Sequence, residues 1–212
     1  MNRSLQIALI LAVAVAGLAA GYLVGRTPTQ GPGLELERGT LFPTPRPLPA
    51  FELQDQDGRP FGPAELRERW SLLFFGFTHC PDVCPATLAT LAATRRELAD
   101  LPEALQPRMV LVSVDPQRDT PEKLKDYVAF FDPGITGVTG TPAAIADLTA
   151  RLGVAVRTSA TDDAGNYSVD HTASLFLVDP DGALSAILST PHTPDGIAHD
   201  YRLIIAARGE QT

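Results

Sequence analysis

The feature that most constrains the fold is an uncharged, mostly apolar run, Ser71 to Phe77, that leads into a segment holding both cysteines of the chain. Such a run predicts a central strand that is covered on both faces. Cys80 and Cys84 follow it, and apolar residues at helical spacing come next. We therefore expect the two sulfurs at a strand-to-helix turn, at the edge of an open α/β sheet where functional sites lie.

Two prolines indicate where this helix begins. If Cys80 were the N-cap, Pro85 would lie beyond the positions that can spare an N–H, and the helix would kink. If Cys84 is the N-cap, Pro85 falls at the first helical position, where its fixed φ and missing donor are tolerated. We therefore expect the helix to start at Cys84, whose thiol would face the positive end of the helix dipole and be favoured as thiolate.

The N-terminal part of the 212 residues differs from the rest in having a long apolar run without charged residues. Leu5 to Gly25 carries no charge and is long enough to span about 30 Å of hydrocarbon as a helix. A cleaved signal peptide is the alternative, but the apolar run is longer than a normal signal core. Residues 1–26 are therefore predicted to be a membrane anchor, and the flanking Arg3 and Arg26 do not decide its orientation.

Residues 27–49 are rich in proline and glycine and are predicted to be a linker to a folded domain at residues 50–212. Subtracting Arg3 and Arg26 from the 17 basic residues leaves 15 against 25 acidic ones, a net charge of −10 beyond the anchor. This balance argues against binding of nucleic acid and against docking on an anionic membrane surface. Two cysteines fit a compartment outside the cytosol without proving it.

Strand and helix patterns alternate through the predicted domain. Asp57-Gly58 predicts an N-terminal hairpin, and Asp179-Pro180-Asp181-Gly182 predicts a hairpin of residues 174–178 and 183–188. Strands are also expected at 109–114 and 154–156, and the segment between the second and third helices is expected to be a turn region. Helices are expected from Cys84 to about Asp100 and after three threonine-proline pairs, Thr120-Pro121, Thr141-Pro142 and Thr193-Pro194. This order is the thioredoxin arrangement of an α/β fold, with an N-terminal hairpin and an insertion before the final hairpin.

In that arrangement, the loop before the final hairpin packs against the cysteine loop. This loop ends in His171, which we therefore expect opposite the two sulfurs. His192 and His199 lie in polar contexts near the last helix and are expected to be solvated. His79 neighbours Cys80, but adjacent residues of an extended segment point to opposite faces.

Two thiolates and one imidazole suit copper. Thiolates are soft ligands for Cu(I), and imidazole binds either oxidation state. Cys80, Cys84 and His171 would give a three-coordinate site, whereas zinc would need a fourth ligand that no other residue clearly provides. Asp170 and Asp115 are weaker candidates to accept a hydrogen bond from the imidazole.

Other uses of the cysteines stay open at this point. A structural disulfide between Cys80 and Cys84 would close so short a loop that it stabilises the fold by only about 2 kcal/mol. Thiol-disulfide exchange usually has two residues between its cysteines, whereas this chain has three. An oxidoreductase would need both cysteines but not His171. A thiol peroxidase is less favoured, because the proline and threonine pattern around a peroxidatic cysteine is missing.

The segments that carry this chemistry resemble the Sco/SenC family of membrane-anchored copper chaperones for cytochrome c oxidase. The matching segments occur in family order and are FGFTHCPDVCP (75–85), VSVDPQRDTP (112–121), VTGT (138–141), YSVDHT (167–172) and DPDG (179–182). The cysteine motif together with the Val-Asp-His segment is a specific signal. By this resemblance Cys80 and Cys84 would be the copper thiolates and His171 the third ligand.

The resemblance also implies a biological role and a location. It implies one copper ion per chain, delivered to the dinuclear copper centre of cytochrome c oxidase, or reduction of the thiols at that centre. The implied partners are the oxidase subunit that holds this centre, and other copper chaperones or thiol reductants. The chain would be a metallochaperone rather than an enzyme with turnover. It would sit in the inner (cytoplasmic) membrane by a single anchor, with its domain facing the periplasm or extracytoplasmic side.

Overall fold

The computed structural model describes residues 34–162 and 167–209, and the residues from Leu36 onward form one compact unit. A mixed sheet of eight strands runs through this unit in the order β1-β10-β9-β4-β5-β6-β2-β3. A separate small sheet pairs β7 with β8. The strands are β1 (Gly39–Pro47), β2 (Leu53–Asp55), β3 (Pro60–Phe61), β4 (Ser71–Gly76), β5 (Arg108–Ser113), β6 (Ile135–Thr139), β7 (Val156–Thr158), β8 (Val169–His171), β9 (Leu175–Val178) and β10 (Ala183–Leu188).

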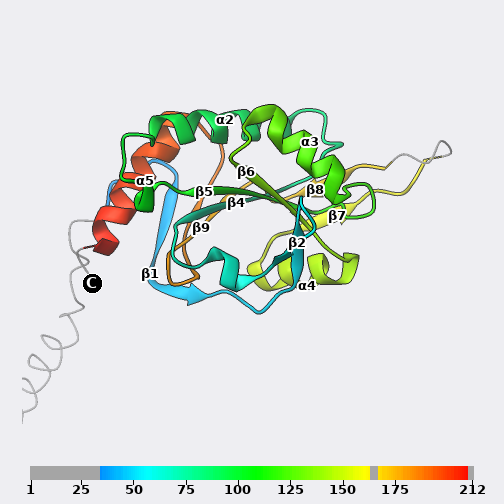
Figure 1. Cartoon of the computed structure of the whole chain (residues 1–212), viewed down its shortest axis with the longest axis horizontal. Helices are drawn as coiled ribbons and strands as arrows, with labels where there is room; N and C mark the ends of the chain where they lie inside the picture. Colours follow the sequence, from blue (N-terminus) through cyan, green and yellow to red (C-terminus); the bar gives the residue numbers. More distant parts are fainter. Residues whose placement is uncertain (1–33, 163–166, 210–212) are drawn as a thin grey trace, which may run out of the picture. The chain divides into compact units, whose positions relative to one another are not determined.

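Helices cover both faces of the sheet. They are α2 (Val83–Glu97), α3 (Pro121–Phe131), α4 (Pro142–Leu152) and α5 (Pro194–Gly209), with short 3-10 turns at Pro63–Leu66 and Glu103–Leu105. Figure 1 shows α2, α3 and α5 along one side of the sheet and α4 along the other. This is the thioredoxin-like α/β arrangement that the order of patterns predicts.

The centre of the sheet confirms the predicted buried strand. Every residue of β4 is buried, and β4 pairs in parallel with β5 from Ser71 opposite Arg108 to Gly76 opposite Ser113. On its other edge β4 pairs antiparallel with β9, the first strand of the predicted final hairpin. Because β4 is covered on all sides, its carboxyl end is a rigid base for the cysteine segment that follows.

The threonine-proline pairs begin helices as predicted. The Oγ1 atoms of Thr120, Thr141 and Thr193 accept hydrogen bonds from backbone N–H groups three residues later, at 3.3, 3.2 and 3.1 Å. The predicted N-terminal hairpin is also present, because β2 pairs with β3 across Asp57-Gly58. Gly58 has a φ of 76°, a left-handed conformation that glycine adopts without steric penalty.

The linker expected at residues 27–49 differs from the structure, because its second half is β1. This strand pairs antiparallel with β10 at the edge of the sheet. Its prolines hid it from the sequence pattern, although an edge strand tolerates proline because one side of its backbone has no strand to pair with. The folded part of the chain therefore begins before residue 50.

Two further strands differ from expectation. The turn region expected between the second and third helices contains β6, which pairs in parallel with β5 and antiparallel with β2. Gly134 and Gly137 obscured its pattern. The strand expected at 154–156 is β7, displaced toward the C-terminus to Val156–Thr158. Together β7 and β8 form the predicted insertion before the final hairpin.

The predicted anchor at residues 1–26 lies outside the residues that the structure describes. Within residues 34–162 and 167–209, no helix is both long enough and apolar enough to span a bilayer. Of the loop expected at 159–165, residues 159–162 are described, and all of them are exposed.

Candidate metal centre

The start of α2 lies between the two cysteines. The helix begins at Val83 with Asp82 as its N-cap residue, so the predicted start with Cys84 as N-cap is wrong by two residues. Pro85 is the third helical residue, and its missing N–H removes no helical bond because the first N–H groups of a helix have no partner within it. The first bond of the helix runs instead from the N–H of Ala86 to the carbonyl of Asp82, at 3.2 Å.

Because the helix starts earlier than predicted, the sulfur at its N-terminus belongs to Cys80. The N–H of Cys84 donates to Cys80 Sγ at 3.4 Å. Both cysteines are free thiols, and Cys80 is partly exposed at the surface. A sulfur that accepts an N–H from the first turn of a helix and meets solvent is well placed for exchange with another molecule.

Cys84 is the inner sulfur of the pair. Its side chain has 0% exposure, and an added Cβ at Gly76 would lie 3.2 Å from Sγ. Burial raises the pKa of the Cys84 thiol, since a thiolate loses its hydration there. The prediction that the helix dipole favours a Cys84 thiolate is therefore wrong for the metal-free protein.

His171 lies next to the inner sulfur, as the loop argument predicts. Its Nε2 is 3.5 Å from Cys84 Sγ, and its Nδ1 is 3.1 Å from the carbonyl oxygen of Thr172. Since a carbonyl only accepts, we assign the proton to Nδ1, which leaves the lone pair of Nε2 facing the sulfur. Burial lowers the pKa of His171 and so favours the neutral imidazole that a metal requires.

Aromatic rings fix the plane of the imidazole. Phe74 and Phe77 make edge contacts with the ring of His171 at centroid distances of 6.0 and 5.8 Å. The partner of Nδ1 is the Thr172 backbone, not the carboxylate of Asp170 or Asp115 that the sequence suggested. Sequence reasoning missed this acceptor, because a backbone carbonyl leaves no signal in the residue pattern.

The remaining histidines are not part of this site. His192 is partly buried, and its Nε2 donates to the carbonyl of Ala173 at 2.8 Å, so it is less solvated than predicted. His199 is exposed beside Asp200, as predicted. The Nδ1 of His79 lies 3.0 Å from Thr78 Oγ1 and 3.8 Å from Asp119 Oδ1.

A second group of potential ligands surrounds His79. Its ligating atom and those of Asp115 and Asp119 lie within 4.8 Å of one another. Asp119, however, already accepts hydrogen bonds from the N–H and hydroxyl of Thr78, at 3.1 and 2.6 Å, and from the Ser113 hydroxyl at 2.6 Å. Asp115 forms an ion pair with Arg118. These carboxylates are occupied by protein donors, so we assign the group a structural role.

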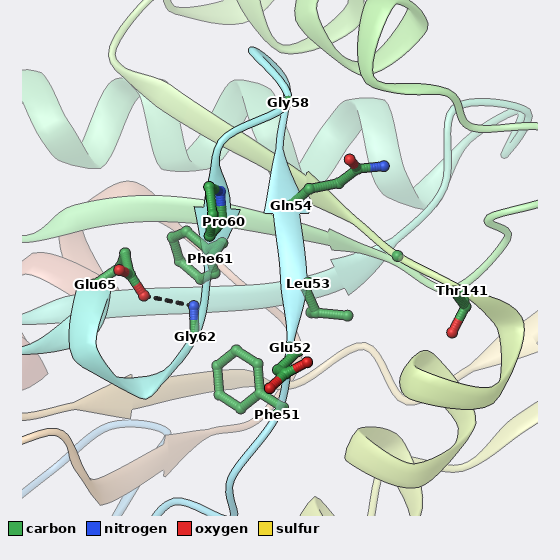
Figure 2. Close-up of a pocket in the computed structure, with 11 residues that line it drawn as sticks. Phe51, Glu52, Leu53, Gln54, Gly58, Pro60, Phe61, Gly62, Glu65 and Thr141 are labelled. Atoms are coloured by element: carbon green, nitrogen blue, oxygen red, sulfur yellow. Dashed lines mark hydrogen bonds between the residues drawn. The ribbon is translucent and has the colours of Figure 1, made fainter.

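A pocket of about 650 Å³ lies at the β2–β3 edge of the sheet (Figure 2). Phe51, Leu53 and Phe61 contribute apolar surface to it. The carboxylate of Glu65 accepts the N–H of Gly62 at 2.6 Å. The lining includes no cysteine or histidine, so this pocket lacks the metal-binding chemistry of the cysteine segment.

Fold and site together define a thioredoxin-like domain with a dithiol and an imidazole at the carboxyl edge of its central strands. The model of the SCO1/SenC family matches residues 43–206, more than half of the chain. The protein therefore belongs to the SCO1/SenC family.

Relatives of the chain agree with this assignment. It is 42% identical over 159 residues to a Stutzerimonas stutzeri protein named for copper binding, a match that covers 74% of this chain and 76% of that protein. It is 34% identical over 157 residues to the mouse mitochondrial protein SCO2 homolog, covering 74% of this chain and 62% of the mouse protein. The chain thus spans less than two thirds of the mouse relative.

A solved structure gives the same result. Bradyrhizobium japonicum ScoI with copper bound aligns with a TM-score of 0.66 and 36% sequence identity, over 74% of this chain and 98% of that chain. That neighbour was solved with copper bound.

Proposed function

We propose that this protein is a copper metallochaperone that delivers copper to the dinuclear copper centre of cytochrome c oxidase during assembly. One copper ion per chain would be held by Cys80, Cys84 and His171. The observation that carries this proposal is the 3.5 Å contact between Cys84 Sγ and the unprotonated Nε2 of His171, whose lone pair faces the sulfur. Two soft sulfurs and one neutral imidazole suit Cu(I).

Copper binding requires the loss of protons from the thiols. Burial raises the pKa of Cys84, so copper must displace the proton of a thiol that is protonated in the metal-free protein. The imidazole gives up no proton, because burial keeps His171 neutral and Nδ1–H remains bonded to Thr172. Phe74 and Phe77 keep the ring in place while the metal enters and leaves.

Release would begin at Cys80. Residue Cys80 is partly exposed, whereas Cys84 is fully buried, so a thiolate of the receiving protein would reach Cys80 first. Exchange of one ligand at a time lets the metal pass without becoming free in solution. If Cys80 and Cys84 instead lose two electrons and two protons to a disulfide of a partner, both sulfur ligands are lost, so copper affinity should follow the redox state.

The proposal includes the location implied by the family resemblance. A single N-terminal anchor would hold the chain in the inner membrane, with the copper site in the periplasm. The partners would be the oxidase subunit that contains the dinuclear copper centre, and the copper chaperones or thiol reductants that load and reduce the site. Nucleic acid is not among them, because the domain is strongly acidic.

A second candidate function is a thiol-disulfide oxidoreductase that keeps the cysteines of the oxidase copper site reduced. The observation in its favour is Cys80, a partly exposed sulfur that accepts an N–H at a helix N-terminus. This function needs both cysteines and has no use for His171.

The test is copper retention by the reduced full chain against a competing chelator. We expect the parent to keep about one copper per chain, and His171→Ala and Cys84→Ser to lose it. The control is His199→Ala, which removes an exposed imidazole and should match the parent. If His171→Ala keeps copper as well as the parent, the three-ligand site is refuted. The oxidoreductase function then takes its place if the dithiol still reduces a disulfide.

A further inference from the structure

The loop between β5 and α3, residues 114–120, contacts both segments that carry the proposed ligands. On the cysteine side, Asp119 accepts from the N–H and the hydroxyl of Thr78, at 3.1 and 2.6 Å. Thr78 lies two residues before Cys80, and the Asp119 side chain has 0% exposure. One side of this loop therefore fixes the cysteine segment.

On the histidine side, the contact is made by Arg118. Its guanidinium carbon lies 3.7 Å from the centroid of the Tyr167 ring, and its Nη1 donates to the Tyr167 carbonyl at 3.1 Å. The hydroxyl of Tyr167 donates to Asp115 Oδ1 at 2.7 Å, and the other oxygen of Asp115 accepts from Arg118 Nε. These contacts form a closed cycle of three residues, Arg118, Tyr167 and Asp115. The cycle holds the backbone carbonyl, the aromatic face and the hydroxyl of Tyr167.

In the part of the chain that the structure describes, the backbone of the segment that carries His171 is not paired with the eight-stranded sheet, although the imidazole itself packs on Phe74 and Phe77. Within the described residues, β8 pairs only with β7, and every residue of β7 is exposed. Tyr167 lies four residues before His171, at the point where the chain enters β8. A shift of Tyr167 would therefore displace the short strand β8 and with it the imidazole of His171.

We propose that Arg118 is a positioning residue for the copper site: by holding Tyr167, it sets the place of His171 opposite Cys84. This inference rests on the proposed function, because it requires His171 to be a copper ligand. Arg118 acts mainly through Tyr167 and β8, and its guanidinium carbon also lies 5.8 Å from the centroid of the Phe77 ring, which packs against His171. Its removal should therefore disturb copper binding through the imidazole and leave the contribution of the two sulfurs intact.

The substitutions must separate this role from a general effect on the fold. The Asp115 side chain is 4% exposed, so removal of Arg118 leaves a buried carboxylate without its ion pair and lowers stability. Tyr167→Phe is the milder variant, because it keeps the ring and the backbone carbonyl and removes only the hydroxyl bond to Asp115. Arg151→Gln is a matched control, because it removes an exposed arginine that pairs with Asp147 on α4.

The experiment is a double-mutant cycle in the reduced full chain, with copper affinity measured by chelator competition. Arg118→Gln is expected to weaken binding about 10- to 100-fold, as second-layer changes at metal sites do. In a His171→Ala background, the same substitution should change affinity by less than about 2-fold, because the residue it acts through is gone. Tyr167→Phe should show a smaller loss with the same dependence on His171, and Arg151→Gln should show none.

A spectroscopic measurement separates positioning from folding. In the protein loaded with Cu(II), electron paramagnetic resonance reports the hyperfine coupling to the imidazole nitrogen. Arg118→Gln and Tyr167→Phe should alter this coupling, whereas a variant that is only less stable keeps it in its folded fraction. If Arg118→Gln fails to fold, Tyr167→Phe decides the matter, and an unchanged coupling and affinity in that variant would overturn the inference.

The outcomes distinguish the two proposals. An equal loss of affinity with and without His171 would overturn the role of Arg118, because the residue would then act on the cysteines or on the fold alone. An Arg118→Gln variant that binds like the parent, beside a His171→Ala variant that loses copper, would also overturn it but leave the proposed function standing. If His171→Ala itself binds like the parent, the proposed function fails, and the inference about Arg118 fails with it.

Discussion

Asp200 holds the start of β1 against α5, and its replacement by asparagine tests whether β1 belongs to the folded domain. Its side chain has 0% exposure and accepts the N–H groups of Glu37, Arg38 and Gly39 at 2.7, 2.9 and 2.6 Å. Asp200→Asn keeps the size of the side chain and one oxygen, but replaces the other oxygen with a donor. At least one of the three N–H groups then loses its acceptor.

The magnitude follows from the contacts. Oδ2 receives two of the three N–H groups, so the amide oxygen should turn to Arg38 and Gly39 and leave its NH2 facing Glu37. The lost bond to a charged acceptor contributes about 1.5–3 kcal/mol, and the two remaining bonds weaken toward the roughly 1 kcal/mol of a neutral pair. Because a neutral amide is also easier to bury, we expect a net loss of about 2–4 kcal/mol.

The assay is urea denaturation of the full chain together with hydrogen exchange of the amides of residues 37–39. We expect Asp200→Asn to lower the free energy of unfolding by that amount and to speed exchange at these three amides. Asp126→Asn, at an exposed position of α3, is the control and should stay within about 0.5 kcal/mol of the parent. A change of the same small size in Asp200→Asn would refute the reasoning, because the buried carboxylate would then not hold β1.

Three further results are expected around the site and the fold. In Gly76→Ala the added carbon would lie 2.7 Å from Phe74 Cε1 and 3.2 Å from Cys84 Sγ. Denaturation should therefore show a free energy of unfolding that is lower by about 1–3 kcal/mol. Unchanged stability would mean that the strand end can shift. In the metal-free protein at pH 8, iodoacetamide should modify Cys80 at least about 10-fold faster than Cys84, because burial raises the pKa of Cys84. Mass spectrometry measures the labelling of each cysteine. Equal labelling would contradict the assigned burial. Burial lowers the pKa of His192 in the folded protein below its ordinary value of 6.5. In acid the unfolded chain therefore binds more protons than the folded chain, and the free energy of unfolding should fall as the pH drops below 6.5. His192→Asn should make this slope shallower in denaturation measured from pH 7 to 5, and an unchanged slope would show that His192 does not contribute to it.

Elements with local signals were predictable from the sequence. The uncharged run of β4 is buried along its whole length, because its own residues decide which environment it can occupy. The threonine-proline pairs begin helices because both the cap and the fixed φ act within one turn. His171 was also found, since the order of elements alone brings the loop before the final hairpin to the cysteine segment.

Elements that depend on distant partners were not predictable. Gly39 and its acceptor Asp200 are 161 positions apart, and no local pattern indicates that a buried carboxylate on α5 will hold a proline-rich segment as an edge strand. Gly137 within β6 and Gly134 just before it reduced the apolar pattern, yet β5 and β2 pair with this strand on both sides. In both strands, pairing supplied by the rest of the sheet overrides a weak intrinsic preference.

At the site, a difference of two residues in the N-cap assignment exchanges the environments of the two sulfurs. With Asp82 as N-cap, Cys80 accepts an N–H of the first turn, and Cys84 turns inward beneath the helix. The prediction of Cys84 as N-cap failed because Pro85 is tolerated at the third helical position as well as at the first. Helix ends are set by which polar groups find partners, and here the partner is a sulfur outside the helix.

The asymmetry of the two sulfurs bears on both candidate functions. Cys80 is the sulfur that a partner can reach, so it would begin either an exchange of copper ligands or an attack on a disulfide. Cys84 is buried, and its pKa is raised, so it would act second in either process. The cysteines alone therefore do not separate a metallochaperone from an oxidoreductase. The separation rests on His171, because a neutral imidazole whose free nitrogen faces a buried thiol is useful to a soft metal and unnecessary for dithiol exchange.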